Sequence, residues 1–109
     1  MTTTYKVLGQ TNPSQTTNTM LYTVPASTSA VCSTLVICNQ STAAATFRIA
    51  VRPAGEALAT KHYIAYDVSI GANDSTTLTL GMTLATTDVI TVYASTTTLS
   101  FNLFGSEIT

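Results

Sequence analysis

Apolar and polar residues alternate with a period of two along most of this chain. In the segment 46–52, for example, Phe47, Ile49 and Val51 share one face, and polar or small residues share the other. No window shows the i, i+3, i+4, i+7 repeat of an amphipathic helix. The alternation predicts eight strands, at residues 4–9, 19–24, 31–39, 45–52, 62–70, 76–84, 88–95 and 98–104.

Turn-forming residues separate these strands, most clearly in 71–74 and 85–88. Eight short strands at this spacing predict an all-β fold: a single-domain antiparallel β-sandwich covering residues 1–109. An even strand count favours a jelly roll of two four-stranded sheets, with an immunoglobulin-like sandwich as the alternative. Residues 54–61 have room for one short helical turn. The tail 104–109 either finishes the eighth strand or lies across a neighbouring subunit.

Two packed sheets need one apolar inner face each. The alternation assigns thirteen large side chains to these faces, each contributing about 1.5 to 3 kcal/mol on burial. In the strand 62–70 it places Ile64, Tyr66, Val68 and Ile70 on a single face. The thirteen predicted core residues are Phe47, Ile49, Val51, Ile64, Tyr66, Val68, Leu78, Leu80, Ile90, Val92, Leu99, Phe101 and Leu103.

The composition agrees with this fold class and narrows the function. Thr, a β-branched residue that suits strands, accounts for 24 of the 109 residues. Only 8% of residues are charged and the net charge is −1, with four Lys plus Arg, which argues against nucleic-acid binding through phosphates. No stretch is apolar enough for a membrane span, and the polar N-terminus does not look like a signal peptide. So little charge favours a chain that works inside an assembly, as a homo-oligomer or bound to a partner.

Two cysteines, Cys32 and Cys38, lie on one predicted strand. Six residues of extended chain span about 20 Å, whereas the Cα atoms of a disulfide lie within about 7 Å of each other. We therefore expect two unbridged thiols that serve as small buried hydrophobic groups in a protein folded in a reducing cytoplasm.

Candidate catalytic and metal-ligating residues are few. His62 is the only histidine, no Gly-x-Ser-x-Gly is present, and the five carboxylates show no spacing typical of a glycosidase pair or a calcium loop. We therefore expect no enzyme activity, no cofactor and no metal site. The cations are more informative, because Arg48 and Arg52 share a strand face and Lys61 and His62 follow close by. Since Arg is enriched at protein interfaces, we expect Arg48, Arg52, Lys61 and His62 to contact a partner.

Five segments together give the chain a resemblance to a known family: Tyr5–Gln10, Leu21–Pro25, Phe47–Pro53, Lys61–Asp67 and Phe104–Ile108. With these segments the chain resembles small virion structural proteins of tailed bacteriophages, particularly those of cyanobacterial and marine phages. The likeness covers nearly the whole chain and includes no catalytic motif.

The resemblance implies an all-β module that assembles on the phage particle inside the bacterial cytoplasm and remains in the virion. Within this class we expect a capsid cement or decoration protein, which would sit as a trimer on the shell and bind the major capsid protein or another virion protein. Two alternatives remain: a small tail-fibre, neck or baseplate module, and a carbohydrate- or host-binding module. Neither nucleic acid nor a membrane is an expected partner.

Overall fold

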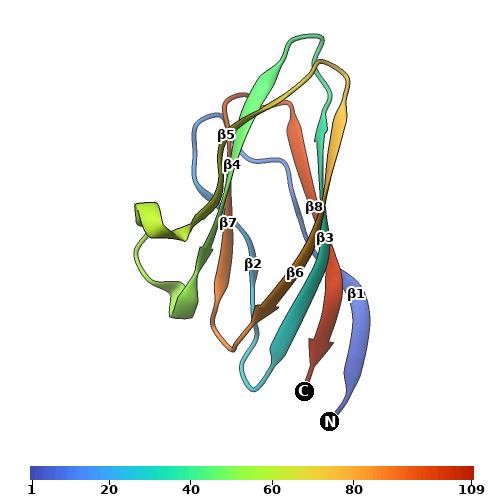
Figure 1. The fold of residues 1–109 in the computed structure, drawn as a ribbon, viewed down its shortest axis with the longest axis vertical. Helices are drawn as coiled ribbons and strands as arrows, with labels where there is room; N and C mark the ends of the chain where they lie inside the picture. Colours follow the sequence, from blue (N-terminus) through green and yellow to red (C-terminus); the bar gives the residue numbers. More distant parts are fainter.

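The computed structural model describes all residues 1–109 as two antiparallel four-stranded sheets packed face to face (Figure 1). All eight predicted strands are present, most with ends within about two residues of the prediction, so the all-β sandwich is confirmed. The strands are β1 (Thr3–Thr11), β2 (Thr19–Thr23), β3 (Ser29–Asn39), β4 (Ala45–Arg52), β5 (Tyr63–Ile70), β6 (Ser75–Leu84), β7 (Val89–Ala94) and β8 (Leu99–Ile108).

The strand order is that of a jelly roll. The first sheet has the order β1-β8-β3-β6 and the second sheet the order β2-β7-β4-β5. The pairs β1·β8, β2·β7, β3·β6 and β4·β5 are those of one long antiparallel ribbon folded over into two layers. Because the first and last strands pair, the two termini lie together at one end of the molecule (Figure 1), where Thr2 and Thr109 exchange two backbone hydrogen bonds of 2.8 and 2.9 Å.

The core between the sheets is a single cluster of 19 buried apolar residues. At its centre the rings of Phe47 and Phe101 meet edge to face, with centroids 6.4 Å apart, which is a favourable aromatic geometry. Val51, Leu78 and Leu80 are only partly buried but pack against this cluster. The predicted core residues that the structure buries fully are Phe47, Ile49, Ile90, Val92, Leu99, Phe101 and Leu103.

The prediction was wrong for three residues of β5. Ile64, Tyr66 and Val68 are 51%, 56% and 40% exposed, while Ile70 is buried as predicted. The β4–β5 register shifts twice, and each time the extra residue is on β5. One shift falls at Asp67, whose φ of 51° lies in the left-handed region. An extra residue reverses which side chains face inward, so on the N-terminal side of Asp67 it is Ala65 that packs against the core and the alternation fails for Tyr66. Val68 lies on the C-terminal side of this shift, opposite the buried Phe47, and is exposed on an edge strand.

Bulges of this kind mark every edge of the sandwich. The edge strands are β1 and β6 in the first sheet and β2 and β5 in the second. In each of their pairings the register shifts, and the extra residue is on the edge strand: Leu8 in β1, Leu21 in β2, and one further residue in β6 near Gly81. Such irregular edges pair poorly with an additional strand.

The two cysteines are unbridged, as predicted. Cys32 is fully buried in the core, and this burial raises the pKa of its thiol to about 11. Cys38 is only partly buried. A register shift at Ser33, between β3 and β8, separates the two residues and changes the face on which the later part of β3 presents its side chains.

Two segments complete the chain. Residues 53–62, here called the covering loop, hold two short 3-10 turns, η1 (Pro53–Gly55) and η2 (Thr60–His62), and project from the outer face of the second sheet (Figure 1). The C-terminal tail continues β8 as far as Ile108 and pairs with both β1 and β3, so it finishes the eighth strand. None of the helical turns has the length or apolar character needed to cross a membrane.

Candidate functional site

Arg48 is at the centre of the outer face of the second sheet. Its guanidinium lies between the rings of Tyr66 and Tyr93, 4.2 Å from each centroid. Its Nε donates to Asp67 Oδ1 at 2.6 Å, and its Nη2 donates to Asp67 Oδ2 at 3.3 Å. These hydrogen bonds raise the pKa of Arg48 further above its already high value. Arg48 is thus held in one orientation, and its charge is balanced by a neighbour.

Arg52 fastens the covering loop to the sheet. Its Nε donates to Thr91 Oγ1 at 3.1 Å, and its Nη1 donates to the carbonyl oxygen of Glu56 at 3.0 Å. Thr91 and Ala50 are opposite each other in the β4–β7 pair, and both are buried although neither belongs to the central core cluster. The covering loop therefore forms a third layer over part of the second sheet.

His62 is buried, with only 5% of its surface exposed, so it does not offer the contact surface that the sequence predicts for it. Its Nδ1 accepts the Ala59 N–H at 3.0 Å, which leaves the ring proton on Nε2 to be donated to Glu56 Oε1 at 3.2 Å. That hydrogen bond, with the nearby Lys61 ammonium at 3.5 Å, lowers the pKa of Glu56. His62 anchors the covering loop, whereas Lys61 is exposed.

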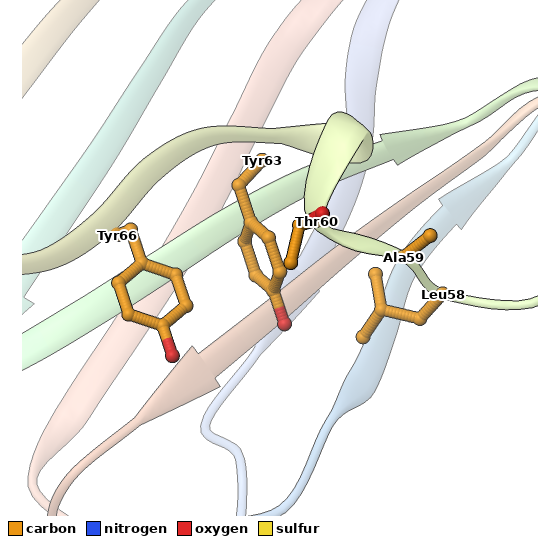
Figure 2. A pocket seen from close by; sticks show the side chains of 5 residues that line it. All are labelled: Leu58, Ala59, Thr60, Tyr63 and Tyr66. Atoms are coloured by element: carbon orange, nitrogen blue, oxygen red, sulfur yellow. The ribbon is translucent and has the colours of Figure 1, made fainter.

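An open groove lies beside Arg48, where the covering loop meets β5. Leu58, Ala59 and Thr60 form one wall, and Tyr63 and Tyr66 form the other (Figure 2). The two tyrosine rings are nearly perpendicular, at 87°, with centroids 4.9 Å apart. Figure 2 shows both side chains extending from β5 in the same direction. Because Tyr66 also carries Arg48 on its ring, the groove and the arginine belong to one continuous surface, here called the tyrosine face.

The tyrosine face contains one of the four predicted contact residues, Arg48, together with Tyr66 and Tyr93, which stack on it. Arg52 is instead bonded to Thr91 and the covering loop, and Lys61 is an exposed residue of that loop. The sequence pattern places Tyr66 in the core and gives Tyr93 no role. One signal was present in the sequence: the segment 62–70 has aromatic residues at both odd and even positions, as expected for a strand with an apolar surface on each side.

The remaining polar groups form hydrogen bonds within the fold. Asp88 accepts the N–H groups of Ala54 and Ala85 at 2.9 and 2.8 Å, and so joins the covering loop to the β6–β7 turn. Every buried side-chain nitrogen and oxygen atom has a hydrogen-bond partner. No group of three or more His, Cys, Asp or Glu residues is placed to hold a metal ion. What this arrangement offers is a rigid, partly apolar surface for binding.

The chain was compared with known proteins. No family model matches it, and neither the curated proteins nor the solved structures yielded a similar protein. The surfaces of the molecule and the sequence resemblance are therefore the indications of its function.

Proposed function

We propose that this chain is a structural protein of a phage virion, a capsid cement or decoration protein that binds the assembled shell as a homo-oligomer. The observation that carries the proposal is the tyrosine face. Tyr66 is more than half exposed there, beside an arginine already fixed between two aromatic rings. Tyrosine and arginine are the residues that protein interfaces favour, and side chains held rigid before binding lose little entropy on contact.

The charges on this face favour a protein partner over a polyanion. Arg48 pairs with Asp67 and Lys61 pairs with Glu56, which leaves little unbalanced positive charge. The complementary surface on the partner, which we propose is the major capsid protein, is therefore mainly apolar with few charges. A strongly acidic patch is not required.

A decoration protein acts through linkage. A ligand that binds only the assembled and expanded lattice lowers the free energy of that state, and of no other, by its free energy of binding. Many copies bound at equivalent sites then oppose the pressure of the packed genome. This role needs a stable, preformed binding surface and no reaction chemistry, and the tyrosine face provides such a surface.

The carbohydrate-binding alternative is less well supported. A sugar would stack its C–H groups on the face of an aromatic ring, but Arg48 already covers one face of Tyr66, and Tyr63 is packed against the same ring. Jelly rolls occur in both viral capsid and lectin domains, so the fold alone favours neither function.

The test is reconstitution on particles. Virions of the phage that encodes the chain are assembled without it, mixed with the purified protein, and sedimented, and the bound copies are counted by quantitative mass spectrometry. We expect saturation at hundreds of copies, and binding at least about tenfold weaker for Tyr66→Ser. Thr77→Ser, on an exposed position of β6 outside the tyrosine face, is the matched control and should bind like the unmodified protein.

Each other outcome has a definite meaning. Absence of binding to any particle overturns the proposal. Saturation at only a few copies supports the tail-fibre, neck or baseplate alternative. Binding that is abolished by a host polysaccharide, and that occurs on cells without particles, supports the carbohydrate-binding alternative.

A further inference from the structure

The outer face of the first sheet carries no charged side chain. Its four strands contain only two charged residues, Lys6 and Glu107. Lys6 Nζ is 3.2 Å from Glu107 Oε1, and Glu107 Oε2 accepts the hydroxyl of Tyr22, a buried residue of the second sheet, at 2.6 Å. Both charges therefore point toward the other layer, and all remaining charged residues are on the second sheet or in loops and turns.

This face presents a groove whose lining is half apolar. Tyr5, Val7 and Phe104 are 84%, 45% and 36% exposed, and Val7 is opposite Phe104 in the β1–β8 pair. Val31, Gly105, Ser33, Ser106 and Lys6 also line the groove. Lys6 is the only charged residue among them, and its ammonium is paired with Glu107. Beyond the groove, β6 exposes mainly threonines. Tyr5, Val7, Val31, Phe104 and Gly105 are here called the neutral face.

The chemistry of the neutral face selects its occupant. A charged partner surface would lose its hydration against this face without gaining an unpaired opposite charge, because Lys6 is already paired with Glu107, and that loss is costly. An occupant that is itself uncharged, with apolar and hydroxyl groups, avoids that cost. The neutral face of another copy is such a surface, and a net charge of −1 gives little repulsion between copies.

The edge strands make a face contact more favourable than strand addition. β1 borders the neutral face, but its extra residue at Leu8 interrupts the ladder that an added strand would need. The inward-pointing Lys6 on the same strand also opposes edge-to-edge pairing. Copies of this chain are thus directed to meet through side chains on the neutral face.

We infer that the neutral face is covered by a second copy of this chain, so that Tyr5, Val7 and Phe104 form the contact between subunits. The inference rests on the homo-oligomer in the proposed function and specifies which surface builds it. It also divides the molecule: the neutral face holds copies together, and the tyrosine face is left free for the partner.

The test is molar mass by light scattering over a concentration series. We expect the unmodified protein to give a multiple of its 11.4 kDa chain mass. For Tyr5→Ser and for Phe104→Ser, we expect the concentration at half-association to rise at least about tenfold. Tyr66→Ser, which removes an exposed tyrosine from the other face, is the matched control and should associate normally. Since Tyr5 is almost fully exposed, its loss removes no core contact, and an unchanged melting temperature verifies that the variant is folded.

The inference is overturned if the unmodified protein stays monomeric at all concentrations, or if the folded Tyr5 and Phe104 variants associate as well as it does. Particle binding is scored separately from association. Association through the neutral face without binding to particles would retain the inference and reject the proposed function. Particle binding by a chain that is monomeric in solution would retain the proposed function and reject the inference.

Discussion

Asp67 lies across the β4–β5 pair from Arg48, with its Oδ1 2.6 Å from the guanidinium Nε. The same residue has a φ of 51° and forms the bulge of β5. One side chain thus holds the arginine between its two tyrosines, while its backbone brings Tyr66 to the outer surface. The tyrosine face depends on both properties, and they can be separated by mutation.

Replacing Asp67 by different residues should separate the contribution of its carboxylate from the contribution of its backbone conformation. Asn tolerates the left-handed region, whereas Ala there costs about 1 kcal/mol more. We expect the free energy of unfolding of Asp67→Ala to be lower than that of Asp67→Asn by about that amount. The free energy of unfolding of Asp67→Gly should be closer to that of Asp67→Asn. Urea unfolding measures all three. Equal stability of the Asn and Ala variants would show that the backbone conformation at this position carries no cost.

Removing the His62 imidazole should release the covering loop. Its two nitrogens bond Ala59 and Glu56, which are both in that loop. We expect His62→Ala to be cut by trypsin after Lys61 several times faster than the unmodified chain, with the rest of the sandwich intact. Thr60→Ala, an exposed neighbour whose side chain makes no hydrogen bond, should be cut at the original rate. Equal rates for both variants would contradict the anchoring role.

Glu107 should contribute stability that is lost in acid. Its hydrogen bond from Tyr22, and then its contact with Lys6, lower its pKa below the unfolded value of about 4.3. A lowered pKa in the folded state gives stability that is fully present above the unfolded pKa and is lost as pH falls through the folded pKa. Glu107→Gln should therefore be less stable than the unmodified protein at pH 7, with a smaller difference at pH 3.

Tyr22→Phe removes the hydroxyl that makes the larger contribution to this shift, and serves as the control. In that background the effect of Glu107→Gln should depend less on pH. The assignment fails if the difference between Gln and Glu at position 107 is the same at pH 3 and pH 7 in the unmodified background.

Gly105 should tolerate no side chain. A Cβ built there would be 2.0 Å from the carbonyl oxygen of Val31, so the strands β3 and β8 would have to separate. We expect Gly105→Ala to lose about 3 kcal/mol or to misfold. Gly81→Ala is the matched control in an edge strand, because no atom is within 4 Å of its added Cβ, and it should change stability by less than about 0.5 kcal/mol. Chemical denaturation of both variants checks this, and equal losses would contradict the close approach at Gly105.

Much of the fold could be predicted because most strands keep a strict alternation. Phe47 and Ile49, for example, sit on a regular strand between two partners, and their burial follows from sequence pattern alone. Eight strands with short turns predicted a sandwich and favoured a jelly roll, with an immunoglobulin-like sandwich as the alternative. Its particular pairing could not be derived, because strand order depends on contacts between residues far apart in the chain.

The candidate site was less predictable, for local reasons. The bulge at Asp67 leaves no mark in the sequence that distinguishes it from an ordinary exposed aspartate, so Tyr66 was assigned to the wrong side. His62 is buried because the covering loop folds back on Arg52, and such a contact depends on tertiary structure. The contact between Arg48 and Tyr93 depends on the register of two strands, which the sequence pattern does not predict.

The interrupted edges have a consequence for how this molecule can grow into larger objects. A sandwich with four regular edges could extend strand by strand without limit and form fibres. Here each edge strand carries an extra residue, so the edges of both sheets pair poorly with a strand from another molecule. Growth is then confined to the two broad faces, each of which can be covered only once. With one face for a second copy and the other for the partner, as inferred above, each chain has a single contact with another copy, and the complexes stay small and finite even at high local concentration.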